Sequence, residues 1–503
     1  MNEVKARPGI ANIRSRLEHC PNEYRLALLV ATGFWLIYLA FLPPGIYSLD
    51  GNSMLAVAES LVTHHSFEVP NELGIPGAGG RIYSWWYPLL SILAVPSTYA
   101  ALLMSHLTGL PFHYLAAILA LPLTGALTAA TAGMVALLAF RMGATLEGAW
   151  LASLSFGFGT VALVYARTFF ADPLLAFITV SALYFALGRT RISVLTAACF
   201  AALAMVAKPA GIVVGPILAA YLIAKRVPLF RSILPLAGTG VGFSIYAGYN
   251  FVRFGQPLNF GIAWPFRLVH ILPGFAGLLA GPGWGLLWYC PAVVLAIFGF
   301  RKAVKERLFE ALAIVMVFAA FLFLHASAWY RLAGWSWGPR YLLPGIPGLC
   351  ALIGLLERSW KKAVVVLTLL GFMVNAPTLF SFYERHYAEL AAQGIPDYNI
   401  AWSVRYAPFL HAWPAAFHQV RDARRSDVKQ IFERRGIPSK TIEESRALRV
   451  VAVWWWVLPL VGVPRWGGFV VAMILVALGC FMLVRAARAT ALHQGFAPSR
   501  GAT

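Results

Sequence analysis

The stretch PPGIYSLDGNSMLAVAESLVTHH, residues 43–65, follows the first long apolar run of the chain and carries its most informative carboxylate, Asp50. The preceding run, residues 24–41, is nearly uncharged and about long enough to cross a ~30 Å hydrocarbon core. Asp50 is therefore expected at a membrane surface, where lipid head groups lie. The residues after it place apolar side chains at helical spacing, which predicts an interfacial helix carrying Leu55, Ala58, Leu61 and Val62.

The composition indicates an all-α integral membrane protein. Of the 503 residues, 60% are hydrophobic and 12% are charged, and the mean hydropathy is +0.71. Soluble proteins carry about 25% charged residues. The net charge of +20 is interpreted as the excess of Lys and Arg that holds short loops in the cytoplasm, so no nucleic-acid partner is expected.

Basic clusters separate the apolar runs and, if all face the cytoplasm, predict about twelve transmembrane helices. The run 88–107 must then begin and end outside the cytoplasm, so it is interpreted as an interfacial or re-entrant helix. The Trp-rich segment 450–464 is given the same interpretation. The predicted spans are 24–42, 113–140, 147–168, 173–188, 192–207, 210–224, 232–251, 285–300, 308–325, 341–356, 363–380 and 467–484.

Three regions follow from these spans. Residues 1–380 form a transmembrane catalytic module whose first exterior loop covers about 43–111. Residues 381–466 form a polar extracytoplasmic region with an interfacial helix, and residues 467–503 contain the last transmembrane helix and a cytoplasmic tail. The expected location is a bacterial inner membrane, crossed many times, with the active site on its extracytoplasmic face.

Two acids and several cations gather on the predicted exterior side. The acids are Asp50 and Asp172, and each also precedes or opens a helical pattern, where a carboxylate can serve only as a cap. Cations suit a phosphate, and a carboxylate suits a hydroxyl that must lose its proton, which together fit sugar transfer from a polyprenyl phosphate. The candidate substrate-binding residues are Arg81, Tyr83, Lys208, Arg253, Arg267, His270, Arg340 and Tyr341.

At these positions the chain resembles the GT-C superfamily of glycosyltransferases that use polyprenyl-phosphate sugars. It is most similar to the bacterial branch of protein mannosyltransferases and the lipid A aminoarabinose transferase. The stretches that carry the resemblance are LDGNSMLAVAESLVTHHSFEVP, GRIYSWWYPLLSILAVP, ARTFFADPLLAF, MVAKPAGIV and WGPRYLLPGIP, in that order over most of residues 43–350.

The resemblance implies a GT-C fold and specific roles for the quoted residues. Asp50 would be the catalytic base or its organiser, and Asp172 a second acid of the active site. Arg81, Lys208 and Arg340 would face the lipid phosphate. The chain departs from the pattern at Gly51, where many relatives have a second acid, and at Ser84-Trp85-Trp86, where a lysine is common.

The expected function is an inverting glycosyltransferase, with a polyprenyl-phosphate-linked sugar as donor and an envelope glycolipid, glycan or protein as acceptor. Two alternatives remain open. One is a lipid or sugar transporter or flippase, for which no internal repeat is found, and the other is an oligosaccharide ligase or polymerase. No cofactor is required by the sequence, although Glu68 and Glu72 are candidate ligands of a divalent metal.

Overall fold

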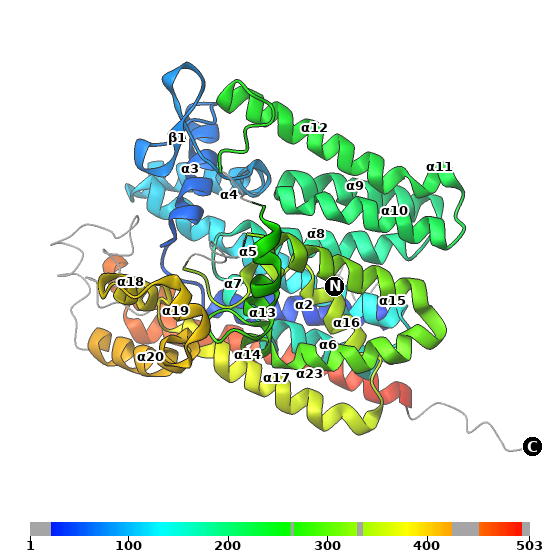
Figure 1. Ribbon diagram of the computed structural model, residues 1–503. Helices are drawn as coiled ribbons and strands as arrows, with labels where there is room; N and C mark the ends of the chain where they lie inside the picture. Colours follow the sequence, from blue (N-terminus) through cyan, green and yellow to red (C-terminus); the bar gives the residue numbers. More distant parts are fainter. Residues whose placement is uncertain (1–21, 263–265, 329–334, 425–451, 495–503) are drawn as a thin grey trace, which may run out of the picture.

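The computed structural model describes residues 22–262, 266–328, 335–424 and 452–494, and these are almost entirely helical (Figure 1). The only sheet among them is a two-stranded antiparallel ribbon of β1 (Ile75–Pro76) and β2 (Ile82–Tyr83) in the first loop. The longer helices are α2 (Asn22–Ala40), α3 (Leu49–Thr63), α4 (Pro88–Thr108), α5 (Phe112–Arg141), α6 (Leu146–Gly159), α8 (Ala171–Ala186), α9 (Arg191–Ala207), α10 (Val214–Ala224), α12 (Leu234–Phe254), α13 (Ile271–Ala280), α15 (Ala296–Ala326), α17 (Lys361–Asn375), α20 (Pro408–Arg424) and α23 (Arg465–Gln494).

Shorter elements connect these helices and shape the site. The short α-helices are α7 (Ala162–Tyr165), α11 (Leu229–Ser232), α14 (Leu286–Tyr289), α16 (Ile346–Ile353), α18 (Glu384–Ala392) and α19 (Asp397–Trp402). The 3-10 turns that matter below are η1 (Asn71–Leu73), η3 (Pro209–Val213), η5 (Pro291–Leu295), η7 (Arg340–Leu342), η11 (Trp454–Trp456) and η12 (Leu458–Val461).

The main helices pack side by side in the order α23, α2, α5, α8, α9 and α12. Small residues allow this close approach. A Cβ atom at Gly238 or Gly242 of α12 would lie 2.1 or 2.3 Å from the carbonyl oxygen of Ala198 or Ala202 of α9. In lipid no hydrophobic effect drives helices together, so they associate through close packing at small residues of this kind.

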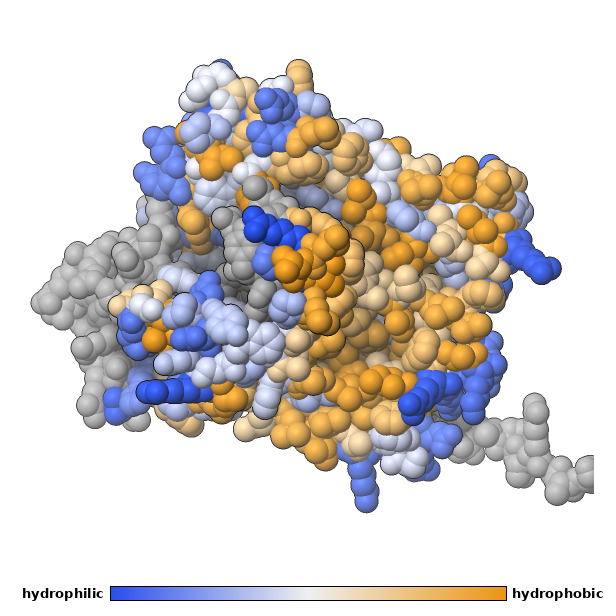
Figure 2. Space-filling view, viewed as in Figure 1, coloured by the Kyte–Doolittle hydropathy of each residue, from blue (hydrophilic) through white to orange (hydrophobic). Residues whose placement is uncertain are grey.

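The surface agrees with a membrane environment. Large apolar side chains are exposed along the helices, and polar residues gather toward the two ends in the face drawn in Figure 2. Six helical segments of the described residues are long and apolar enough to cross a membrane: 22–40, 88–108, 112–141, 291–326, 358–379 and 465–489. Several of the remaining predicted spans correspond to shorter apolar helices, and 232–251 matches the 21-residue α12, so the count of about twelve stays a prediction.

Most predicted spans coincide with a helix, but two of them are joined. The predicted spans 285–300 and 308–325 become α14, η5 and α15, and α15 continues through the basic cluster between them. Its backbone leaves the helical conformation at Arg307, with φ −139° and ψ 47°. The break predicted from the charges is therefore present as a kink and not as a loop.

The charged residues divide between two ends of the helices. Asp172 lies at the start of α8, and the carbonyl of Tyr184 near its end accepts a hydrogen bond from Arg141 at 2.5 Å. Twelve residues of helix separate the two positions, or roughly 18 Å. We call the end with Asp50 and Asp172 the site end, and the end with Arg141 and Tyr184 the opposite end.

Helix α4 and the helix after it both begin against elements of the site end. Ser91, in its first turn, donates to the carbonyl of Met54 at 2.7 Å. His113, in the first turn of the following helix α5, lies 2.6 Å from Glu59, which like Met54 belongs to α3. Because the starts of α4 and of α5 both adjoin the same 15-residue helix, the arrangement fits the interfacial interpretation of 88–107, although α4 is also long enough to cross.

The late region lies beside the first loop. Helices α18, α19 and α20 occupy the same side of the molecule as β1 and α3, whereas α11 lies on the other side (Figure 1). The segment expected as an interfacial helix forms the turns η11 and η12 instead, and Trp454 donates through its backbone to Leu42 at 2.8 Å. Much of the expected charged subdomain, residues 425–449, falls outside the described residues.

Candidate active site

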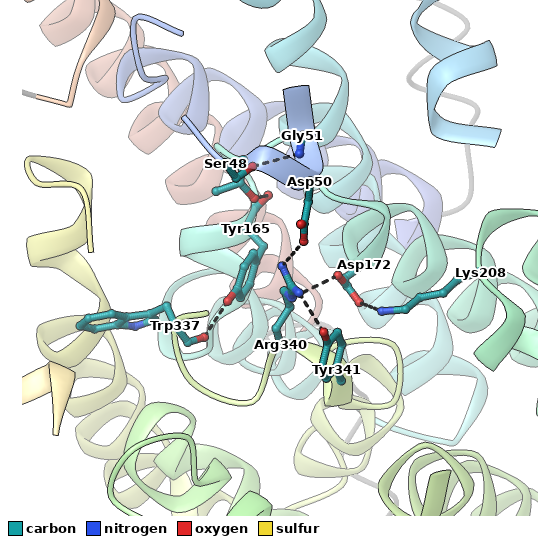
Figure 3. A network of polar contacts seen from close by, with 10 residues as sticks. Ser48, Asp50, Gly51, Tyr165, Asp172, Lys208, Trp337, Arg340 and Tyr341 are labelled. Carbon is teal, nitrogen blue, oxygen red and sulfur yellow. Dashed lines mark hydrogen bonds and ion pairs between the residues drawn. The ribbon is translucent and has the colours of Figure 1, made fainter. Parts of the chain in front are cut away.

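Four charged side chains from distant parts of the sequence meet at the site end (Figure 3). Lys208 Nζ lies 2.7 Å from Asp172 Oδ1, and Arg340 Nε lies 3.7 Å from Asp172 Oδ2. Arg340 Nη1 also lies 3.4 Å from Asp50 Oδ2. Asp50, Asp172, Lys208 and Arg340 form what we call the acid–cation cluster, and the sequence predicted all four as site residues.

Both acids occupy the second position of a helix. Ser48 is the N-cap of α3 and accepts from the Gly51 amide at 3.1 Å, so Asp50 is not the cap of that helix. Phe170 holds the N-cap position of α8, and Asp172 follows one residue inside it. The capping interpretation of the two acids is therefore wrong. Carboxylates in a first turn are still favoured by the helix dipole.

The cations lie where helices are interrupted. Lys208 ends α9 and begins η3, so its ammonium group sits near the negative end of the α9 dipole. Arg340 opens η7 and donates from Nη2 to the Tyr341 hydroxyl at 3.0 Å. Lys208 Nζ lies 4.3 Å from the centre of the Tyr341 ring, so this tyrosine contacts both cations.

Burial distinguishes the two acids. The side chain of Asp172 is 4% exposed and is held between two cations, whereas that of Asp50 is 26% exposed and has one cation beside it. Burial raises the pKa of the Asp50 carboxyl above its ordinary value, and the Arg340 guanidinium opposes that rise. Asp50 is thus the acid with access to an incoming molecule, and Asp172 is placed to position Lys208 and Arg340.

Gly51 departs from the family pattern for a steric reason. A Cβ atom at this position would lie 2.7 Å from Cγ2 of Ile46 and 2.8 Å from Oγ of Ser48. Real Cβ atoms essentially never approach other atoms so closely. The first turn of α3 therefore has no room for a second acid beside Asp50.

The first-loop candidates do not contact the cluster in the described residues. Arg81 is paired with Glu68 at 2.9 Å and its side chain is 62% exposed. Tyr83 is buried in β2, with its ring 6.4 Å from that of Phe254. Glu72 is exposed in η1, and no group of three or more His, Cys, Asp or Glu side chains in the described part could hold a metal. The expected metal ligands thus receive no support.

Arg253 holds the first loop to α12. Its guanidinium is fully buried and donates to the carbonyls of Ser84 and Trp86 and, at 2.6 Å, to Asn250. These contacts explain the residue as a structural anchor of the segment that the resemblance singles out. The exposed Arg267 precedes η4 (Leu268–His270) and the half-buried His270 ends it. The Arg267 amide donates to the carbonyl of Ser327 at 3.1 Å.

Several residues of the site were missed by the sequence analysis. The imidazole of His325 stacks on Tyr341 with ring centres 4.7 Å apart, and Phe170 lies 4.4 Å from the Arg340 guanidinium. Tyr165 is buried and donates to the carbonyl of Trp337 at 2.9 Å (Figure 3). Tyr165 and His325 are ordinary residues of predicted apolar spans, and Phe170 lies in the turn between two spans, so only the fold reveals their places.

A largely apolar cavity of about 600 Å³ adjoins the cluster. Lys208 and His325 line it on the side of the cluster. The rest of the wall comes from the first loop, from η3 and from the segment after α12, with Trp85, Tyr87, Pro209, Ile212, Leu258 and Phe260 among its residues. We call this space the apolar cavity.

Comparison with known proteins finds similar solved structures but no matching family model and no curated relative. ArnT from Cupriavidus metallidurans, solved with undecaprenyl phosphate, aligns at 19% identity and a TM-score of 0.48, covering 91% of this chain and 77% of that one. ArnT is the lipid A aminoarabinose transferase, a branch of the GT-C superfamily that the sequence resembles.

A second group of similar structures is archaeal. The oligosaccharyltransferase AglB from Archaeoglobus fulgidus, solved with an inhibitory peptide and a dolichol-phosphate, aligns at 14% identity and a TM-score of 0.43. The alignment covers 82% of this chain and 59% of AglB. At this level of similarity, what this chain does has to be inferred from its own site.

Proposed function

We propose that this chain is an inverting glycosyltransferase that moves a sugar from a polyprenyl-phosphate carrier to an acceptor of the bacterial envelope. The observation that carries the proposal is the acid–cation cluster at the wall of the apolar cavity. The cluster presents the cations Lys208 and Arg340 beside an apolar space, which matches a phosphate attached to a prenyl chain. The exposed carboxylate of Asp50 matches the hydroxyl of an acceptor.

The cations would bind and stabilise the phosphate. A lysine ammonium has three N–H donors and a guanidinium has five. Contacts to Asp172, Asp50 and Tyr341 occupy only part of this set, which leaves donors of Lys208 and Arg340 for phosphate oxygens. Such contacts strengthen as the glycosidic bond breaks, because negative charge then builds on the leaving phosphate.

Asp50 would act as the general base. The acceptor oxygen forms a bond to the anomeric carbon while the bond from that carbon to the phosphate oxygen breaks. The proton of the acceptor hydroxyl passes to the Asp50 carboxylate, and the phosphate leaves with the bonding electron pair. Asp172 does not touch the reacting atoms in this scheme and serves as a positioning residue for the two cations.

The site is proposed to face the extracytoplasmic side. The support comes from charge: the opposite end carries Arg141 with its neighbours Arg307 and Lys361, which fits the positive-inside tendency. The sugar, a hexose or a pentose, is not specified by the residues of the cluster.

Replacing Arg340 by Ala tests the phosphate site. In nanodiscs supplied with a panel of undecaprenyl-phosphate-linked sugars and envelope acceptors, we expect turnover to fall by about one to three orders of magnitude. The matched control is Arg81→Ala, since the sequence analysis also predicts Arg81 to face the lipid phosphate, but in the structure Arg81 is paired with Glu68. Equal turnover in the Arg340 variant and wild type, or an equal loss in both variants, would contradict the assignment.

A further inference from the structure

A second, smaller space adjoins the segment that precedes Asp50. A cavity of about 40 Å³ is lined by Tyr47 and Ser48, which directly precede α3, and by Tyr383 and Glu384 at the start of α18. Ser48 is the N-cap two residues before Asp50. This inner cavity therefore adjoins the beginning of the helix that carries the proposed base.

A larger cavity continues outward from the same turn. It has a volume of about 300 Å³ and lies between α18 and α20. Ser381, Phe382 and Tyr383 line both this cavity and the inner one. We call the two together the α18–α20 vestibule, because this three-residue turn lines both.

The direction of the proposed reaction gives the vestibule a role. In an inverting displacement the acceptor oxygen approaches the anomeric carbon from the side opposite the leaving phosphate. With the phosphate beside Lys208 and the apolar cavity, the acceptor must arrive from the other side of Asp50. In Figure 3, Ser48, which lines the inner cavity, and Trp337, which lines the outer one, lie on the opposite side of Asp50 from Lys208, so the vestibule borders this other side.

The lining of the outer cavity indicates the chemistry of its occupant. Aromatic rings are supplied by Trp337, Phe382 and Tyr383, and imidazoles by His386, His411 and His418. The rings of His386 and His411 stack with centres 4.8 Å apart. Burial lowers the pKa of His386, which favours its neutral form near pH 7.

The charged groups of the lining are balanced. Arg385 donates to Gln419 across the cavity wall, and Glu389 supplies one carboxylate. Apolar ring faces combined with many hydrogen-bonding groups and little net charge suit a neutral, hydroxyl-rich ligand. A phosphate-rich ligand would call for a basic lining, and an acyl chain would call for an apolar one.

We propose that the α18–α20 vestibule is the acceptor site of the enzyme and that the acceptor group it recognises is a saccharide. The proposal rests on the proposed function, because the position of the vestibule matters only if Asp50 deprotonates a hydroxyl. It assigns the late region a role in choosing the acceptor, while the apolar cavity serves the donor.

Filling the vestibule tests the proposal. Ala415 is exposed and lines the outer cavity, so Ala415→Trp obstructs it without entering the packed core. Val420→Trp is the matched control, because it adds the same side chain to an exposed position of α20 that does not line the cavity. His411→Leu is a second variant that removes one polar group and keeps the volume.

The readout is saturation-transfer NMR of the full chain in nanodiscs with a panel of neutral oligosaccharides, and native mass spectrometry with undecaprenyl phosphate. We expect wild type and Val420→Trp to give a saturation-transfer signal for at least one saccharide. In Ala415→Trp and His411→Leu that signal should be at least fivefold weaker. All four proteins should keep undecaprenyl phosphate and the same unfolding temperature within about 2 °C.

Two outcomes would overturn the proposal: no saccharide signal in wild type, or an undiminished signal in Ala415→Trp. Failure of the proposed function is separate, because it would appear as absent binding of undecaprenyl phosphate by wild type.

Discussion

Asp50 and Asp172 hold the same position in their helices but have different neighbours, and this difference assigns their roles. Asp172 is enclosed by Lys208 and Arg340, whereas Asp50 contacts Arg340 and remains partly exposed. A carboxylate enclosed by two cations is a poor proton acceptor, because protonation would discard both interactions. The exposed acid is therefore the better candidate for the base.

Replacing Asp50 by Asn tests this assignment. The amide keeps the size of the side chain but cannot accept the proton of the acceptor, so turnover should fall by roughly 10²–10⁴-fold. Glu59→Gln is the matched control, since Glu59 is another acid of α3 and is paired with His113 outside the cluster. Near-normal turnover of purified Asp50→Asn would remove Asp50 from the mechanism.

The raised pKa of Asp50 predicts a particular dependence on pH. The base must be ionised, so turnover should fall as the pH drops through a pKa above the ordinary Asp value of about 3.9. Since Arg340 lowers this pKa, the residual activity of Arg340→Gln should be lost at a still higher pH. The check is the profile of turnover against pH for both proteins.

Glu384 provides the control for that profile. Burial raises the pKa of Glu384 to about 7, so its protonation could cause a separate fall in turnover at low pH, which we call the acidic limb of the profile. The acidic limb should persist in Glu384→Gln if Asp50 causes it. A limb that disappears in Glu384→Gln, or one that stays in place in Arg340→Gln, would be inconsistent with Asp50 as the base.

The members of the acid–cation cluster could be predicted from the sequence because charged residues at the ends of apolar runs are rare and costly. The partners of other charged residues could not. Nothing local distinguishes Arg81, which pairs with Glu68, from Arg340, which joins the cluster. The sequence likewise predicts Arg253 to be an exterior cation. Its burial against Ser84 and Trp86 depends on how α12 packs against the first loop.

At the scale of elements, the site is built where helices begin or stop. Asp50 lies in the first turn of α3 and Asp172 in the first turn of α8, Lys208 separates α9 from η3, and Arg340 opens η7. Helix ends leave backbone groups unpaired and point dipoles outward, so they favour charged side chains. Sequence patterns locate such ends within a few residues for several spans, such as 192–207 against α9. They fail for 147–168, where α6 ends at Gly159, and for 341–356, where the only α-helix is the short α16.

The placement of α4 gives a prediction at this scale. In a chain whose five cysteines are replaced by alanine, a cysteine introduced at exposed Thr108 should react with a membrane-impermeant thiol reagent from the same side as one at Arg81. A cysteine at exposed Arg191 should react only after the membrane is permeabilised. These outcomes follow if the starts of α4 and of α5, which both adjoin α3, lie at one membrane surface.

Labelling of Thr108 together with Arg191 would instead mean that α4 crosses the bilayer. The charge pattern could not decide between these topologies, because α4 is apolar enough for either. The contacts of Ser91 and His113 with α3 supply the distinguishing observation.

At the scale of the whole molecule, the proposed scheme uses two cavity systems built from different parts of the fold. The apolar cavity draws its walls from the first loop, η3 and the segment after α12, and the vestibule from the segment before α3, residues 164–169, α18 and α20. The sequence suggested the helical membrane fold and the exterior loops, but the cavities require long-range packing that no local pattern specifies.

We propose that the acid–cation cluster holds the phosphate of a polyprenyl-phosphate carrier. A cryo-electron-microscopy map of the full chain in nanodiscs with added undecaprenyl phosphate tests this. We expect density for the phosphate within hydrogen-bond distance of Lys208 and Arg340, and density for the prenyl chain along Tyr87 and Phe260 in the apolar cavity. Phosphate density at another site, or a cavity that stays empty at saturating lipid, would contradict it.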